Sequence, residues 1–215
     1  MSAADFVRLP NLLSLTRIAL IVPLGYFISR NDPASHAIAV ALVALAGITD
    51  GLDGYLARRL NQVSSLGIAL DPVADKIFAA ALIILLMIFR SFPLWLAAVI
   101  IGRDLLILLA GSILLAGRDI TLPSNLTGKY AFFSIVMLLL SYIMHFDFGI
   151  HLLTPISVVL IAASLFNYGR LFIKVRAGQP APQFNDKPAY RLARIFVTAG
   201  LSILYVVKLY LDVVR

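Results

Sequence analysis

The chain has 215 residues, of which 61% are hydrophobic and only 13% are charged. A soluble domain usually carries about 25% charged residues, so this composition excludes an ordinary water-soluble globule and indicates several membrane helices. The absence of cysteine excludes disulfides, thiolate catalysis and cysteine-bound zinc. A net charge of +7 beside long apolar stretches favours membrane lipids and phosphate-bearing substrates as partners, and no nucleic acid is expected.

A bilayer core needs about 20 apolar residues per helix, and the sequence predicts six such spans in chain order. They lie at 12–29, 35–56, 72–89, 93–116, 130–146 and 149–170. A proline-containing linker at 177–188 precedes a seventh apolar stretch at about 192–212, which either spans the membrane or lies in its interface. The predicted fold is an all-α polytopic membrane protein: a six-transmembrane-helix bundle (1–175) plus an additional C-terminal helix (176–215).

Lysine and arginine in the loops predict the orientation of these spans, because cytoplasmic loops carry an excess of both. With the N-terminus in the cytoplasm, the loops on that side hold Arg58, Arg59, Arg118, Lys129, Lys174, Arg176, Lys187, Arg191 and Arg194. The opposite side holds Arg30 and Arg90, joined by Lys208 and Arg215 if the last helix spans. This bias places the loop at 57–70 on the cytoplasmic side, and we expect an integral protein of the bacterial inner membrane.

Four of the eleven acidic residues, all of them aspartates, lie between residues 50 and 75. Asp50 and Asp53 fall on one face at the cytoplasmic end of the second span. Asp71 and Asp75 share a face at the start of the third, because they are four residues apart. A short loop joins the two spans, so they are antiparallel neighbours. The four carboxylates are therefore expected to converge at the membrane boundary.

Four like charges near lipid are unfavourable unless they are protonated or neutralised by cations. Carboxylate oxygens suit hard ions such as Mg²⁺ or Mn²⁺, and four of them suit a pair of ions that clamps a phosphoryl group. Read singly, the residues have simpler explanations: Asp71 before Pro72 is a normal helix N-cap, and Arg58 is a membrane anchor. The small residues Gly54, Ala57 and Gly67 leave room for a bulky ligand, and Arg58 can pair with phosphate.

The spacing D-x2-D-G-x2-A-R-x8-G-x3-D-x3-D, from Asp50 to Asp75, resembles the signature of the CDP-alcohol phosphatidyltransferases at every defined position. The segment from Pro10 to Arg17 is also similar to that family's first helix. The resemblance covers about residues 8–173 and implies a six-helix fold, often a homodimer, with the nucleotide on the cytoplasmic side.

By this resemblance, roles can be assigned to the residues of the signature. The implied metal ligands are Asp50, Asp53, Asp71 and Asp75, and Asp75 is also the general base. The CDP site is lined by Asp53, Gly54, Ala57, Arg58 and Gly67. The implied reaction moves a phosphatidyl group from CDP-diacylglycerol to an alcohol acceptor: two divalent ions bind the pyrophosphate, Asp75 accepts the hydroxyl proton, and CMP leaves.

Three basic residues in later spans are candidate ligands for a phosphate on the acceptor: Arg103, Lys129 and Arg170. Read separately, Arg103 forms a self-neutralising pair with Asp104, and the other two are snorkelling anchors. The best acceptor is glycerol 3-phosphate. However, Ala110 and Gly111 stand where the glycerol-phosphate branch of the family carries a second arginine, so phosphatidylglycerol or another alcohol is the alternative acceptor.

The alternative from another functional class is a cation or proton transporter that uses the same carboxylates. Transport sites usually lie near the membrane midplane, whereas these aspartates are expected at one face. Metal-dependent release of CMP from a CDP-lipid distinguishes the two, because a transporter releases none.

Overall fold

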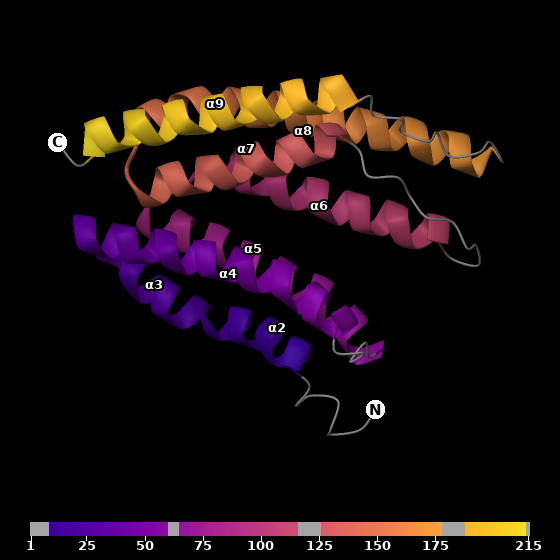
Figure 1. Ribbon diagram of the computed structural model, residues 1–215, viewed down its shortest axis with the longest axis horizontal. Helices are drawn as coiled ribbons and strands as arrows, with labels where there is room; N and C mark the ends of the chain where they lie inside the picture. Colours follow the sequence, from indigo (N-terminus) through magenta and orange to yellow (C-terminus); the bar gives the residue numbers. More distant parts are fainter. Residues whose placement is uncertain (1–8, 60–64, 116–125, 178–187, 214–215) are drawn as a thin grey trace. The chain divides into compact units, whose positions relative to one another are not determined.

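The computed structural model describes the backbone of residues 9–59, 65–115, 126–177 and 188–213 (Figure 1). Within these ranges, the side chains of 9–11, 53–58, 65–72, 113–115, 188–190, 193, 197 and 213 lie outside the description. Every element in the described ranges is helical, which confirms the all-α prediction. The chain divides into two compact units, Met1–Pro93 and Leu94–Arg215, which we describe separately.

The first unit contains the helices α2 (Leu9–Ala19), α3 (Ile21–Ser29), α4 (Pro33–Arg59) and α5 (Ser65–Phe89). Helices α2 and α3 both pack against α4 and α5. The predicted single span at 12–29 is interrupted at Leu20, since Pro23 has no N–H to donate to the carbonyl of Ala19. Apolar side chains from three of these helices form the core, among them Leu24, Ile28, Ala39, Ala46, Leu82 and Leu86.

Two polar contacts close the turns of this unit. The backbone N–H of Ser35 donates to Asp32 Oδ1 at 2.9 Å, and Pro33 occupies the first position of α4, a typical start for a helix. Arg90, which follows α5, donates through Nη2 to the carbonyl of Arg30 at 2.6 Å and through Nη1 to Asn31 Oδ1 at 3.2 Å. Arg90 therefore fastens the end of α5 to the connection between α3 and α4.

The second unit contains α6 (Leu94–Leu115), α7 (Leu126–Ile143), α8 (Asp147–Arg176) and α9 (Pro188–Val213). Helix α8 packs against α7 and also against α6. The connection from α7 to α8 is tight: His145 has a φ of 53°, and a Cβ on Gly149 would collide with the buried ring of Phe146. Only glycine therefore fits at position 149. The short turn that it permits places α7 and α8 side by side and antiparallel.

Six helical stretches in the described side-chain set are long and apolar enough to cross a membrane. They are Leu12–Ser29, Pro33–Leu52, Leu94–Ser112, Leu126–Ile143, Asp147–Arg176 and Arg194–Asp212. The predicted span at 72–89 lies within α5, whose side chains are described only from Val73 onward. Many large apolar side chains on these helices are exposed, as lipid contact requires. The division at residue 175 stays a prediction.

Candidate functional site

A buried arginine near the end of α2 joins two of the predicted metal ligands. Arg17 is 2% exposed, and its Nη1 lies 3.2 Å from Asp50 Oδ1 on α4. The same nitrogen pairs with Asp75 Oδ1 on α5. A guanidinium buried among apolar helices needs a carboxylate partner, and Arg17 has two from different helices. The antiparallel arrangement predicted that Asp50 and Asp75 converge, and both carboxylates indeed contact the same nitrogen, Arg17 Nη1.

The other residues of the signature lie on the same two helices, but their side chains are outside the described set. Asp53, Gly54, Ala57 and Arg58 belong to the last turns of α4. Gly67 and Asp71 belong to the first turns of α5. Their roles as metal ligands and CDP contacts therefore stay predictions.

The position of Asp71 differs from the simpler reading of its sequence. A residue directly before proline is a common N-cap, and the third span was predicted to begin at 72. Helix α5 instead begins at Ser65, so Asp71 lies inside the helix, and Asp75 follows it one turn later. Asp71 is therefore not at an N-cap.

The described part of this cluster suits a hard cation. The Asp50 and Asp75 side chains are half exposed, at 50% and 42%, so both offer oxygens to a ligand. A positive guanidinium nitrogen already stands beside one oxygen from each, which shows that this place favours positive charge. Oxygen donors without histidine or cysteine fit Mg²⁺ or Mn²⁺. No group of three or more candidate ligands gathers among the described residues, which do not include the Asp53 and Asp71 side chains.

Arg17 was not assigned a role from the sequence, although it ends the segment similar to the family's first helix. A cation within an apolar span is a signal of function, because its burial in lipid is costly. Its partners lie 33 and 58 residues along the chain, as the numbers 17, 50 and 75 show. Helical periodicity connects only near neighbours, so it offered no way to find this contact.

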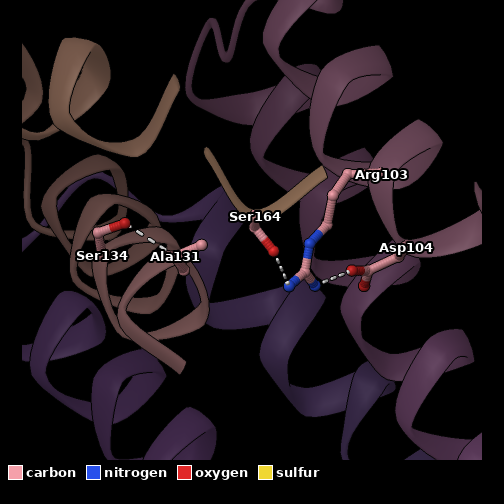
Figure 2. A network of polar contacts seen from close by, with 5 residues as sticks. All are labelled: Arg103, Asp104, Ala131, Ser134 and Ser164. Atoms are coloured by element: carbon pink, nitrogen blue, oxygen red, sulfur yellow. Dashed lines mark hydrogen bonds and ion pairs between the residues drawn. The ribbon is translucent and has the colours of Figure 1, made fainter. Parts of the chain in front are cut away.

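The second unit holds a separate polar network around Arg103 of α6, shown in Figure 2. Its Nη1 donates to Asp104 Oδ1 at 2.6 Å, and its Nη2 donates to Ser164 Oγ of α8 at 3.3 Å. The Arg103 side chain is 11% exposed. The expected pair with Asp104 is therefore present, and a second contact extends it to α8.

The start of α7 completes this corner of the second unit. A Cβ on Gly128 would lie 3.4 Å from Arg103 Nη2 and 3.5 Å from Ser164 Oγ, so glycine allows α7 to approach the guanidinium closely. The Asn167 amide of α8 donates to Thr127 Oγ1 at 3.1 Å, which fixes the start of α7 against α8.

The two other predicted acceptor ligands are exposed near this corner. Lys129 follows Gly128 on α7. Arg170 lies on α8 with its guanidinium carbon 5.8 Å from the centre of the Phe166 ring. Neither side chain has an ion pair or hydrogen bond to the described residues. The structure thus places Gly128, the neighbour of Lys129, beside Arg103, and it does not bring the three cationic groups together at one point.

Comparison with known proteins supplies independent information. A family model described as CDP-alcohol phosphatidyltransferase matches residues 7–172. Rat cardiolipin synthase (CMP-forming) is 38% identical over 166 residues, which cover 74% of this chain and 52% of the relative. The chain thus spans about half the length of this relative and of its human counterpart.

Two bacterial relatives are instead CDP-diacylglycerol–glycerol-3-phosphate 3-phosphatidyltransferases. The protein of *Bacillus subtilis* is 33% identical over 151 residues, covering 64% of this chain and 77% of the relative. The protein of *Aquifex aeolicus* is 32% identical over 172 residues, covering 75% of this chain and 94% of the relative. The names of the first set thus state a product, cardiolipin, whereas those of the second state an acceptor, glycerol 3-phosphate.

Proposed function

Because the chain belongs to the CDP-alcohol phosphatidyltransferase family, we propose that it transfers a phosphatidyl group from CDP-diacylglycerol to an alcohol and releases CMP. Such an enzyme contributes to phospholipid biosynthesis. The observation that carries the proposal is the contact of Arg17 with Asp50 and Asp75, the first and last aspartates of the signature. It draws α4 and α5 together at the residues to which the family signature assigns the chemistry.

The proposed cofactor is a pair of divalent ions, Mg²⁺ or Mn²⁺, held by the four carboxylates of Asp50, Asp53, Asp71 and Asp75. When bound, these ions offset the negative charge of the CDP pyrophosphate. The half-exposed oxygens of Asp50 and Asp75, and the cation already beside them, support this assignment. Asp53, Gly54, Ala57, Arg58 and Gly67 are the proposed CDP contacts.

Asp75 is the proposed general base. Its carboxylate accepts the proton of the acceptor hydroxyl as that oxygen bonds to the phosphorus bearing the diacylglycerol. The bond from this phosphorus to the bridging pyrophosphate oxygen breaks, and CMP leaves with the electron pair. Arg17 is a positioning residue in this account, because its buried guanidinium holds Asp75 and Asp50 in fixed directions.

The proposed acceptor carries a phosphate, with Arg103, Lys129 and Arg170 as its ligands. They come from α6, α7 and α8 of one unit, and the contacts of Gly128 and Ser164 with Arg103 support their proximity. Glycerol 3-phosphate is the first candidate, in line with the names of the Bacillus subtilis and Aquifex aeolicus relatives. Phosphatidylglycerol is the second, because Ala110 and Gly111 of α6 provide no second cation.

The apolar helices and membrane-enzyme relatives support an integral membrane protein. The finer location is part of the proposal: a bacterial inner membrane, with the active site on the cytoplasmic face. A homodimer is proposed from the family resemblance.

An acceptor screen tests the proposed reaction. The purified full chain is given CDP-diacylglycerol, Mg²⁺ and, in turn, glycerol 3-phosphate, inositol phosphate, serine or phosphatidylglycerol. The expected product forms with glycerol 3-phosphate, or with phosphatidylglycerol under the second assignment. Product with serine alone would contradict a phosphate-binding acceptor pocket.

A further inference from the structure

The start of α7 has a small space beside Arg103, because residue 128 is a buried glycine. A Cβ on Gly128 would lie 3.4 Å from Arg103 Nη2, 3.5 Å from Ser164 Oγ and 3.5 Å from the ring atom Cε2 of Tyr168. These are ordinary van der Waals distances, so the point accommodates one atom of methyl or oxygen size. All four residues belong to the second unit. We call this point the Gly128 gap.

The groups that border the gap carry more hydrogen-bond donors than they use. Arg103 Nη2 has two hydrogens and gives one to Ser164 Oγ, at 3.3 Å. Arg103 Nε is buried and has no hydrogen-bond partner among the described residues. Ser164 is fully buried, and its own hydroxyl hydrogen meets no acceptor in the part of the chain that the structure describes. A buried donor without an acceptor is unfavourable, so this corner favours an added acceptor atom.

The chemistry of the donors indicates which acceptor atom suits the gap. An oxygen close to the Gly128 Cβ position needs only a small shift to reach hydrogen-bond distance, about 2.7–3.2 Å, from Arg103 Nη2 and Ser164 Oγ. The guanidinium favours an anionic oxygen, because charge-assisted hydrogen bonds are the stronger ones. Water fits less well, since its own two hydrogens also need acceptors. A nonbridging phosphate oxygen is anionic and has no hydrogen to place.

Contacts from α8 fix the gap before any ligand arrives. Figure 2 shows the Ser164 hydroxyl directed at the Arg103 guanidinium. Asn167, one turn after Ser164, donates its amide to Thr127 Oγ1 at 3.1 Å. Thr127 directly precedes Gly128, so this bond holds the start of α7 against α8. The same helix therefore positions both the donors and the backbone that border the gap.

We propose that the Gly128 gap receives one nonbridging oxygen of the acceptor phosphate, with Arg103 and Ser164 as its donors. This inference rests on the proposed transfer to a phosphate-bearing acceptor. It adds Gly128 and Ser164 to the residues that determine acceptor choice. Glycerol 3-phosphate and phosphatidylglycerol both carry such an oxygen, so the gap recognises the group that they share.

Gly128→Ala tests the proposal most directly, because the new methyl group fills the gap. Alanine favours a helix more than glycine does, and its Cβ makes only ordinary contacts here, so the fold should be kept. We expect the acceptor KM to rise roughly tenfold or more, while the KM for CDP-diacylglycerol changes little. Gly169→Ala is the matched control: its Cβ meets no atom within 4 Å, and the acceptor KM should stay at the wild-type value.

A pair of serine variants tests the donor and leaves the gap open. Ser164→Ala should also raise the acceptor KM roughly tenfold, because it removes one donor and a partner of Arg103. Ser157→Ala is its control, since Ser157 is equally buried on α8 and its hydroxyl has no hydrogen-bond partner among the described residues. Equal changes in the two serine variants would refute the contact. This pair keeps the test decisive if Gly128→Ala fails to fold, which its Tm reveals.

Steady-state kinetics of the purified full chain are measured with glycerol 3-phosphate and with phosphatidylglycerol in separate series. The acceptor that the wild-type chain uses is the one whose KM the Gly128 and Ser164 variants should raise. A folded Gly128→Ala chain with the wild-type acceptor KM would overturn the inference and leave the proposed transferase function standing. Absence of CMP release from the wild-type chain with either acceptor would instead refute the proposed function, and this inference with it.

Discussion

The two units each contain a shielded arginine, and the arginines differ in their partners. Arg17 of α2 contacts carboxylates from two other helices, whereas Arg103 of α6 contacts its sequence neighbour Asp104 and an uncharged serine of α8. Around Arg17, the two described carboxylates, of Asp50 and Asp75, outnumber the one guanidinium. The other two proposed acceptor ligands, Lys129 and Arg170, lie on α7 and α8 of the same unit as Arg103.

The difference shows two uses of an arginine: it can neutralise part of a cation-binding site, or it can belong to an anion-binding site. Arg17 offsets part of an acidic cluster and leaves exposed oxygens that attract cations. Arg103 is offset by Asp104, and Lys129 and Arg170 of the same unit are assigned to an anion in the proposed acceptor site. We therefore expect changes around Arg17 to affect metal and chemistry, and changes around Arg103 to affect the acceptor.

The largest effect is expected for Asp75→Asn, which breaks the acidic cluster at its proposed base. Loss of a general base lowers kcat by about 10²- to 10⁴-fold, while binding of CDP-diacylglycerol largely survives. Steady-state kinetics and a lipid-binding titration measure the two quantities. Asp147→Asn, at the exposed start of α8, is the matched control and should keep the wild-type kcat. Wild-type turnover of the Asp75 variant would remove this residue from the mechanism.

Lys129→Ala and Arg170→Ala test the basic cluster. Losing a charge-assisted hydrogen bond to phosphate costs about 1.5–3 kcal/mol, so the acceptor KM should rise roughly 10- to 150-fold. The KM for CDP-diacylglycerol should change far less. Kinetics with each substrate varied in turn separate the two effects, and Lys174→Ala serves as a control on an exposed cation farther along α8. Equal effects on both substrates, or none on either, would show that these residues are only membrane anchors.

Arg17→Gln and Arg103→Gln compare the two arginines directly. Each change leaves a carboxylate without its cation, and we expect a loss of about 1–3 kcal/mol in the free energy of unfolding. Added Mg²⁺ should restore stability to the Arg17 variant, because it supplies the missing charge to Asp50 and Asp75. It should not restore the Arg103 variant, whose carboxylate partner among the described side chains is Asp104 alone. Denaturation in EDTA and in Mg²⁺ measures this, and equal behaviour of both variants would contradict the assigned difference.

The smallest effect is expected at Asp32, before α4. Hydrogen bonds from the Ser35 hydroxyl, and then from the Ser35 backbone N–H, lower the pKa of Asp32 below its ordinary value of 3.8. The ionised carboxylate therefore stabilises the fold above pH 3.8, and this contribution is lost as the pH falls through the lowered pKa. Asp32→Ala should reduce Tm slightly at pH 7, and the difference from wild type should vanish in strong acid. A difference that persists there would assign the effect to something other than the charge.

The fold and the site were predictable to the extent that their signals are local. The convergence of Asp50 and Asp75 was predictable, because helical periodicity places each on a known face of its helix and a short loop makes the two helices antiparallel neighbours. Pro23 also carried the signal for the break between α2 and α3. In contrast, Gly67 and the polar residues before it are typical of a loop, so the early start of α5 at Ser65 was missed.

Two other features depend on contacts that sequence spacing does not encode. The partners of Arg17 lie on helices packed from distant parts of the chain. The contact of α9 with α7 depends on Tyr205, whose hydroxyl lies beside Ser141. In both cases the residue types were visible in the sequence, and only their packing showed what they contact.

Release of CMP from CDP-diacylglycerol by the purified full chain tests the central claim most directly. The assay compares protein dialysed exhaustively against EDTA with the same protein after Mg²⁺ or Mn²⁺ is added, in the presence of glycerol 3-phosphate or phosphatidylglycerol. We predict acceptor-dependent CMP release that stops in EDTA and returns with either ion. Full activity in EDTA would contradict the metal cluster around Asp50 and Asp75, and no CMP release under any of these conditions would contradict the transferase itself.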